Sequence, residues 1–134
     1  MKAIHSIEGI GQGYADKLKQ AGIGTVEALL DQAGDKAARK RVAEKTGLSE
    51  KLILKWVNMA DLFRIHGVAA QYAELLERSG VDTVKELAQR NAASLHAKMN
   101  EINEAKPVVR RPPALRIVES WISEAKSLPR KVTY

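Results

Sequence analysis

Apolar residues along the chain recur at helical spacing. After the Gly9–Gly11 segment they fall three and four positions apart, at Tyr14, Ala15, Leu18 and Ala21. This spacing is typical of the buried face of an amphipathic helix. Gly22 then predicts the end of that helix, because glycine readily adopts the left-handed backbone that closes a helix C-terminus. No segment alternates apolar and polar residues as a half-buried strand would, so the pattern predicts an all-α fold.

The same pattern predicts further helices along the chain. We expect helices at Val26–Leu30 with Thr25 as N-cap, Lys36–Lys45 ending at Gly47, a helix capped by Ser49 with Leu52, Ile53, Trp56, Val57 and Ala60 inward, Ser94–Glu104 and Ala114–Ser127. Thr83 and Glu86 have the spacing of a capping box. With the repeat described next, this amounts to about eight helices.

The chain contains an internal repeat. Shifting the sequence by 58 positions aligns Ile7–Leu30 with Ile65–Ala88 without a gap, and nine of the 24 aligned pairs are identical. Trp56 recurs as Trp121, 65 positions later, so seven extra residues lie in the second copy. We therefore expect two repeats, 1–62 and 63–134, packed as one protein. Proline disfavours helix at and before itself, which predicts an extended connector at 106–113 and a short non-helical tail from Pro129.

The start of the first repeat matches the helix-hairpin-helix motif, in which an apolar residue precedes Gly-apolar-Gly and an alanine follows on the second helix. Ile7–Ala15 has this arrangement. Glycine permits a tight turn with positive φ, and the bare amides of the following helix N-terminus form a shallow phosphate site. The predicted phosphate-binding residues are Gly9, Ile10, Gly11, Gln12, Gly13, Tyr14, Lys17 and Lys19.

The same glycines also permit a purely structural interpretation, in which the hairpin only joins helices and its apolar residue fills the core. The second copy reads Gly67-Val68-Ala69 and so lacks one motif glycine, which favours the structural interpretation and makes the first copy the stronger candidate for a phosphate site. Glu8 and Asp16 lie near the first hairpin, where negative charge would repel phosphate. Tyr14, Tyr72 and the two tryptophans occupy repeated apolar positions, and we expect them in the core.

The balance of charge favours a polyanionic partner. The 134 residues carry 22 Lys and Arg against 16 Asp and Glu, a formal charge of +6. A basic cluster adds an auxiliary anion-binding patch, predicted at Lys36, Arg39, Lys40 and Arg41. Arg110-Arg111 in the connector and Arg130-Lys131 near the end are further candidates. A few such contacts predict salt-sensitive, non-specific binding with a dissociation constant of about 10⁻⁴ to 10⁻⁶ M.

A second DNA-binding pattern overlaps the end of the first repeat. Arg41–Ser49, followed by Ile53 and Trp56, has the spacing of a helix-turn-helix. Two helices joined by a glycine turn need the same spacing to bury Leu48, Ile53 and Trp56, and the second repeat does not keep the pattern. Core packing is therefore the favoured interpretation.

Other classes of function have little support in the residues. The chain has no cysteine, which excludes disulfides and thiolate chemistry. Its histidines, His5, His66 and His96, are scattered, and we find no metal-ligand spacing, nucleophile elbow or P-loop. No apolar run approaches a membrane span. We expect no cofactor and no enzymatic activity, no membrane association, and a cytoplasmic location.

Several segments resemble a bacterial family catalogued as domain of unknown function 4332. The resemblance covers nearly the whole chain and is carried by the hairpin Ile7–Ala15 and the segments Thr46–Leu62, Gly80–Asn91 and Val118–Arg130. It implies tandem helix-hairpin-helix modules with a SAM-like architecture, related to those of DNA polymerases, repair proteins and the RNA polymerase alpha C-terminal domain. It implies no particular activity and no catalytic residues.

Together these observations predict a non-catalytic module that binds the DNA backbone without sequence preference, weakly, through the first hairpin. The alternative is a protein-interaction or scaffold domain whose hairpins are architectural, with another protein as its partner.

Overall fold

The computed structural model describes residues 2–134, and within them it is built from helices. A 3₁₀ turn, η1 (Ile4–Ser6), is followed by α1 (Gln12–Gln20), α2 (Val26–Gln32), α3 (Lys36–Thr46), α4 (Glu50–Leu62), α5 (Ala70–Arg78), α6 (Val84–Ala88), α7 (Ala92–Ala105) and α8 (Leu115–Ser127). The described residues form no strand, only one isolated bridge between Ala3 and Thr25. The prediction of an all-α protein with about eight helices is confirmed.

The repeat seen in the sequence returns in the helix boundaries. α5 begins and ends 58 residues after α1, and α8 begins and ends 65 residues after α4. The difference between the two offsets is taken up before α8, in a longer α7 and in the connector. α7 begins at Ala92, two residues before the predicted Ser94, because Asn91 caps it by accepting from the Ser94 amide at 3.0 Å.

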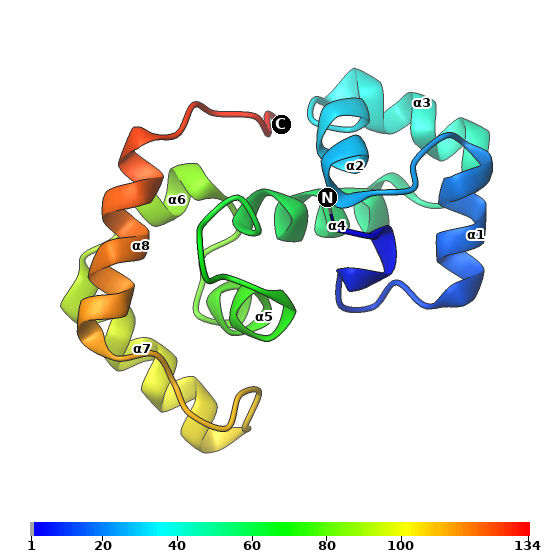
Figure 1. Ribbon diagram of the computed structural model, residues 1–134. Coiled ribbons are helices and arrows are strands. Elements are labelled where there is room, and N and C mark those ends of the chain that lie inside the picture. Colours follow the sequence, from blue (N-terminus) through cyan, green and yellow to red (C-terminus); the bar gives the residue numbers. More distant parts are fainter. Residues whose placement is uncertain (1) are drawn as a thin grey trace. The chain divides into compact units, whose positions relative to one another are not determined.

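The chain forms two compact units. The first contains the residues up to Asp61 together with Lys131–Tyr134, and the second is Leu62–Arg130. In the first unit α3 packs against α1 and α2, and η1 contacts the same two helices. In the second unit α8 packs along α6 and α7, and α5 contacts α7 (Figure 1).

Predicted N-cap residues mark the start of α2 and of α6. The Thr25 hydroxyl accepts from the Ala28 amide at 3.0 Å, and the Thr83 hydroxyl accepts from the Glu86 amide at 3.3 Å. In a capping box the Glu86 carboxylate would accept from the Thr83 amide. Here it accepts from the amide of the preceding residue, Asp82, at 3.1 Å. These side-chain acceptors satisfy amides that the first helical turn leaves without a carbonyl partner.

Each unit has one tryptophan in its core, and each tryptophan contacts the tyrosine in the first turn after the glycines. Trp56 is 1% exposed and Trp121 is 2% exposed. Tyr14 lies 5.1 Å from Trp56 between ring centroids at 60°, and Tyr72 lies 5.4 Å from Trp121 at 59°. The prediction that Tyr14 belongs to the core is wrong: its ring covers Trp56 from outside and remains 40% exposed.

The connector between α7 and α8 is non-helical, as the prolines predict, and it is held by one buried side chain. The Asn103 carbonyl oxygen accepts from the amides of Val108 and Val109 at 2.7 and 3.0 Å, and its amide nitrogen donates to the Val109 carbonyl at 3.0 Å. The chain therefore bends between residues 108 and 111 and buries Val109, where an extended connector was expected.

Candidate nucleic-acid interface: the two glycine loops

The loop before α1, which we call the first glycine loop (Ile7–Gly13), is fixed by one buried residue and one left-handed glycine. Ile10 is 4% exposed, and its amide donates to the Ile7 carbonyl at 3.1 Å. Gly9 has φ +92°, a conformation that residues with a Cβ rarely adopt. Gly11 has φ −83° and ψ −175°, ordinary extended values, so its glycine is not required by the turn.

The first turn of α1 presents unused amides to solvent. Gly11 is the N-cap and offers no side-chain acceptor. No residue in the described chain accepts from the main-chain N–H groups of Gly11, Gln12, Gly13 or Tyr14. All four residues are exposed, and the missing Cβ atoms of Gly11 and Gly13 would meet nothing within 4 Å. Helix amides in this arrangement favour an anion, because the helix dipole adds partial positive charge there.

The second glycine loop (Ile65–Gln71) has the same backbone despite its altered sequence. Gly67 has φ +86°, and Ala69 at the N-cap has φ −106° and ψ −173°. The amides of Ala69, Ala70, Gln71 and Tyr72 likewise have no acceptor among residues 2–134. Replacing the second motif glycine by Ala69 therefore changes no backbone conformation. The lost glycine, which favoured the first copy at the level of sequence, does not distinguish the two loops.

The charges around the two loops differ. Lys17 lines a shallow hollow of about 510 Å³ together with Gly9, Gly11, Gly13 and Tyr14. In the second unit Leu75 stands at the position of Lys17. There the Glu124 carboxylate accepts from the His66 amide of the loop at 2.9 Å, and the Tyr72 hydroxyl donates weakly, at 3.5 Å, to the main-chain carbonyl of Arg111 in the connector.

Two carboxylates lie near the first loop, and one of them accepts a hydrogen bond while the other is exposed to solvent. The Asp16 carboxylate accepts from the Gln12 side-chain amide at 2.7 Å on the exposed face of α1. Glu8 is exposed, with no hydrogen bond or ion pair in the described chain. Neither carboxylate caps the amides of Gly11–Tyr14, so the helix N-terminus stays open.

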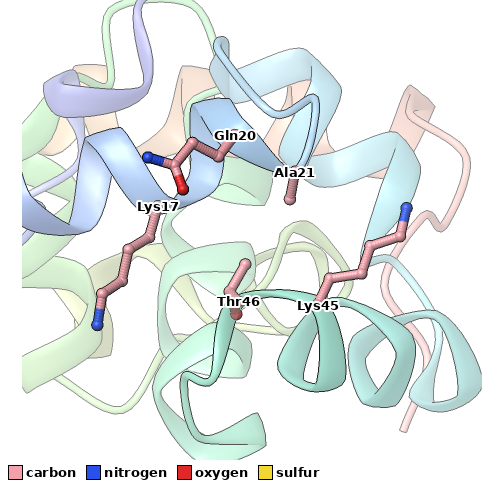
Figure 2. Close-up of a pocket in the computed structure, with 5 residues that line it drawn as sticks. All are labelled: Lys17, Gln20, Ala21, Lys45 and Thr46. Atoms are coloured by element: carbon pink, nitrogen blue, oxygen red, sulfur yellow. The ribbon is translucent and has the colours of Figure 1, made fainter.

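Lys17 also lines a second hollow, of about 410 Å³, between α1 and the end of α3. Figure 2 shows Lys17 at one end and Lys45 at the other, with Gln20 at the end of α1, Ala21 directly after it, and Thr46 opposite them. The Thr46 hydroxyl donates to the Val42 carbonyl at 2.7 Å, which leaves the two lysines and Gln20 as the donors available to an anion. Lys45 was missed as a candidate, since only the packing of α3 against α1 brings it near Lys17.

The predicted basic patch on α3 divides between the two flanks of the helix. Arg41 lines a hollow with Lys45 and Ala21, on the flank that faces α1. Lys36 lines a different hollow with Lys51 and Tyr134. Lys40 is exposed. Lys19 lies in the last turn of α1, at the end of the helix away from the bare amides.

Arg39 requires a correction, because it is a buried structural residue. It is 4% exposed, and its guanidinium donates to the carbonyls of Ala33, Gly34 and Thr133 at 3.2, 2.9 and 2.6 Å. Burial lowers the pKa of Arg39 from its ordinary value, against the opposing attraction of Asp35. These donations hold the guanidinium on main-chain carbonyls, so Arg39, although it lines the same hollow as Lys36, is not a free surface cation.

The described residues bring no three His, Asp or Glu side chains together in a way that could hold a metal ion. Among residues 2–134 no helix combines the length and apolar character needed to cross a bilayer.

Leu48, Ile53 and Trp56 are buried, as the packing interpretation of the helix-turn-helix pattern requires.

The fold and the loops define a class of protein. It is an all-α chain with a duplicated unit, and in each copy a glycine loop precedes a helix whose N-terminal amides are open. A family model described as Domain of unknown function (DUF4332) matches residues 8–128. The chain belongs to this family. A comparison with curated proteins and one with solved structures gave no match.

Proposed function

We propose that this protein is a non-catalytic module that binds the DNA backbone without sequence preference, through glycine loops of the helix-hairpin-helix type. The observation that carries the proposal is the open N-terminus of α1, where the amides of Gly11–Tyr14 have no acceptor among the described residues. Lys17 lies in the same hollow and adds a full positive charge. A phosphate oxygen is the ligand that this set of donors suits best.

The donors are main-chain amides and long, exposed side chains, and this composition supports recognition of phosphate rather than bases. Contacts of this kind position a protein on the duplex but carry no sequence information. Of the basic residues, Lys17 lines the hollow of the first loop, whereas Lys45 and Arg41 line hollows at the C-terminal end of α1. We expect weak binding whose log–log dependence on salt has a slope of about −0.9 for each phosphate neutralised.

The test uses the N-cap position of α1. Gly11 has extended backbone and open space at its Cβ, so Gly11→Asp will fold. Aspartate is also a preferred N-cap and is expected to stabilise α1 by about 1 kcal/mol relative to alanine. Its carboxylate occupies the amides that would otherwise bind phosphate. Gly11→Asp should therefore be at least as stable as Gly11→Ala and bind a labelled duplex markedly less.

Binding is measured by anisotropy of a labelled duplex at two salt concentrations, with Gly11→Ala as the matched control. Gly11→Ala should bind as the unaltered protein does, because Ala69 already occupies the equivalent position with the same backbone. Absence of binding at low salt, or equal binding by the Asp and Ala variants, would refute the proposal. Equal affinity for duplexes of unrelated sequence is also required.

The rival function is a protein-interaction domain with architectural hairpins. The exposed Glu8 and the Asp16 carboxylate beside the first loop are the observations in its favour. A partner recovered equally well by the unaltered protein and by Gly11→Asp after nuclease treatment would support it. Recovery that depends on nucleic acid would count against it.

A further inference from the structure

The tryptophan of each unit lies directly beneath its left-handed glycine. A Cβ on Gly9 would stand 3.8 Å from the indole nitrogen of Trp56, and a Cβ on Gly67 would stand 3.7 Å from that of Trp121. In both cases this nitrogen is the only atom of residues 2–134 within 4 Å, apart from atoms of the glycine and its two chain neighbours. The absent side chain of the glycine therefore leaves space above the indole N–H, in both units alike.

Neither indole N–H has a hydrogen-bond acceptor among residues 2–134, although Trp56 and Trp121 are at least 98% buried. Within the described chain, no fully buried side-chain nitrogen or oxygen lacks a partner. The small exposed fraction of each tryptophan must therefore include its nitrogen. An indole N–H is a donor only, so a nitrogen that reaches the surface donates to water unless another acceptor takes its place.

Each indole ring contacts the first turn of the helix whose amides are open. Tyr14 in the first turn of α1 contacts Trp56, and Tyr72 in the first turn of α5 contacts Trp121, with nearly identical geometry. Gly9 itself lines the hollow that it shares with Gly11, Gly13 and Lys17. The indole N–H and the helix amides thus border the same glycine loop.

The two units keep these donors while their charges diverge. Lys17 is replaced by Leu75, and Glu8 by His66, yet the left-handed glycine, the tyrosine and the tryptophan recur. We propose that the indole N–H groups of Trp56 and Trp121 donate to phosphate oxygens, so that each unit holds one phosphate of a nucleic-acid backbone between its indole and its helix amides. This proposal rests on the proposed function and adds a second, equivalent site in the second unit.

The experiment follows the two indole ¹⁵N–¹H resonances of the full chain, which contains two tryptophans. Trp56→Phe and Trp121→Phe assign the two signals. The protein is titrated with inorganic phosphate, with chloride at matched ionic strength, and with a short duplex. Both indole signals should shift saturably with phosphate and with duplex, and not with chloride. In Gly11→Asp, the Trp56 signal should stop responding while the Trp121 signal still responds, which gives an internal control.

The affinity effect provides a second readout. Trp56→Phe keeps an aromatic ring but removes the donor, and it should weaken duplex binding by about tenfold or more, since tenfold is the lower end for a hydrogen bond to a charged group. If the duplex binds by anisotropy but the indole signals do not move, or move equally with chloride, the indole sites are refuted and the proposed function stands. If the duplex does not bind, the proposed function is refuted, and the indole sites that rest on it are refuted as well. A response of Trp56 alone would refute the site in the second unit.

Discussion

Replacing Arg39 by methionine tests whether this residue stabilises the first unit or serves as a surface cation. Methionine keeps most of the aliphatic stem but removes three hydrogen bonds, to the carbonyls of Ala33, Gly34 and Thr133. A hydrogen bond to a charged group contributes about 1.5–3 kcal/mol, but the three share one side chain, and removing the buried charge recovers part of its desolvation cost. We expect Arg39→Met to lower the free energy of unfolding by about 2–4 kcal/mol.

Urea unfolding measures this loss in the first unit alone when Trp56 fluorescence is followed in a Trp121→Phe background. Lys40→Met is the matched control, because Lys40 is the exposed neighbour of Arg39 on the same helix and should change stability by less than about 0.5 kcal/mol. Arg39→Lys keeps the charge but cannot reach three carbonyls as a planar guanidinium does, so it should also be destabilised. Equal stability of Arg39→Met and Lys40→Met would refute the structural role and return Arg39 to the candidate surface.

Three further predictions concern local structure. Gly9→Ala places a Cβ at φ +92° and should cost about 1 kcal/mol of stability by chemical denaturation, whereas Gly11→Ala should change stability by less than about 0.5 kcal/mol; equal losses would contradict the assigned backbone. Asn103→Ala leaves the connector amides without their acceptor and should cost about 2 kcal/mol, with faster amide exchange at residues 108–109; unchanged exchange would argue against the role of Asn103. Thr25→Ala and Thr83→Ala each remove an N-cap and should each lower the free energy of unfolding by about 1 kcal/mol, the Thr83 loss appearing in the second unit. Unchanged stability of either variant would contradict the capping role of that threonine.

Local sequence rules account for most of the helix boundaries. Threonine and serine caps, glycine stops and three-four apolar spacing depend on residues a few positions apart, so Thr25, Ser49 and Gly47 could be assigned without tertiary information. The rules failed where a nearby residue competed: Asn91 caps α7 two residues before the predicted start.

The sequence motif predicted the backbone of the phosphate-binding candidates only in part. The motif correctly indicated Gly9 as the residue that requires a left-handed backbone, yet it gave Gly11 the same weight, although Gly11 and Ala69 share extended values. Counting glycines in the second copy therefore gave the wrong reason to prefer the first loop. Whether either loop binds phosphate stays a prediction.

The sequence by itself determined the all-α class, the repeat and the ends of most helices, because these follow from local spacing and from the comparison of the chain with itself. Only the tertiary structure decided which cations are available. Arg39 turns inward because the segment Lys131–Tyr134, far away in the sequence, supplies the Thr133 carbonyl, and Lys45 joins Lys17 because α3 packs on α1. Such contacts depend on which faces of separate helices meet, and a one-dimensional pattern of residues does not specify this.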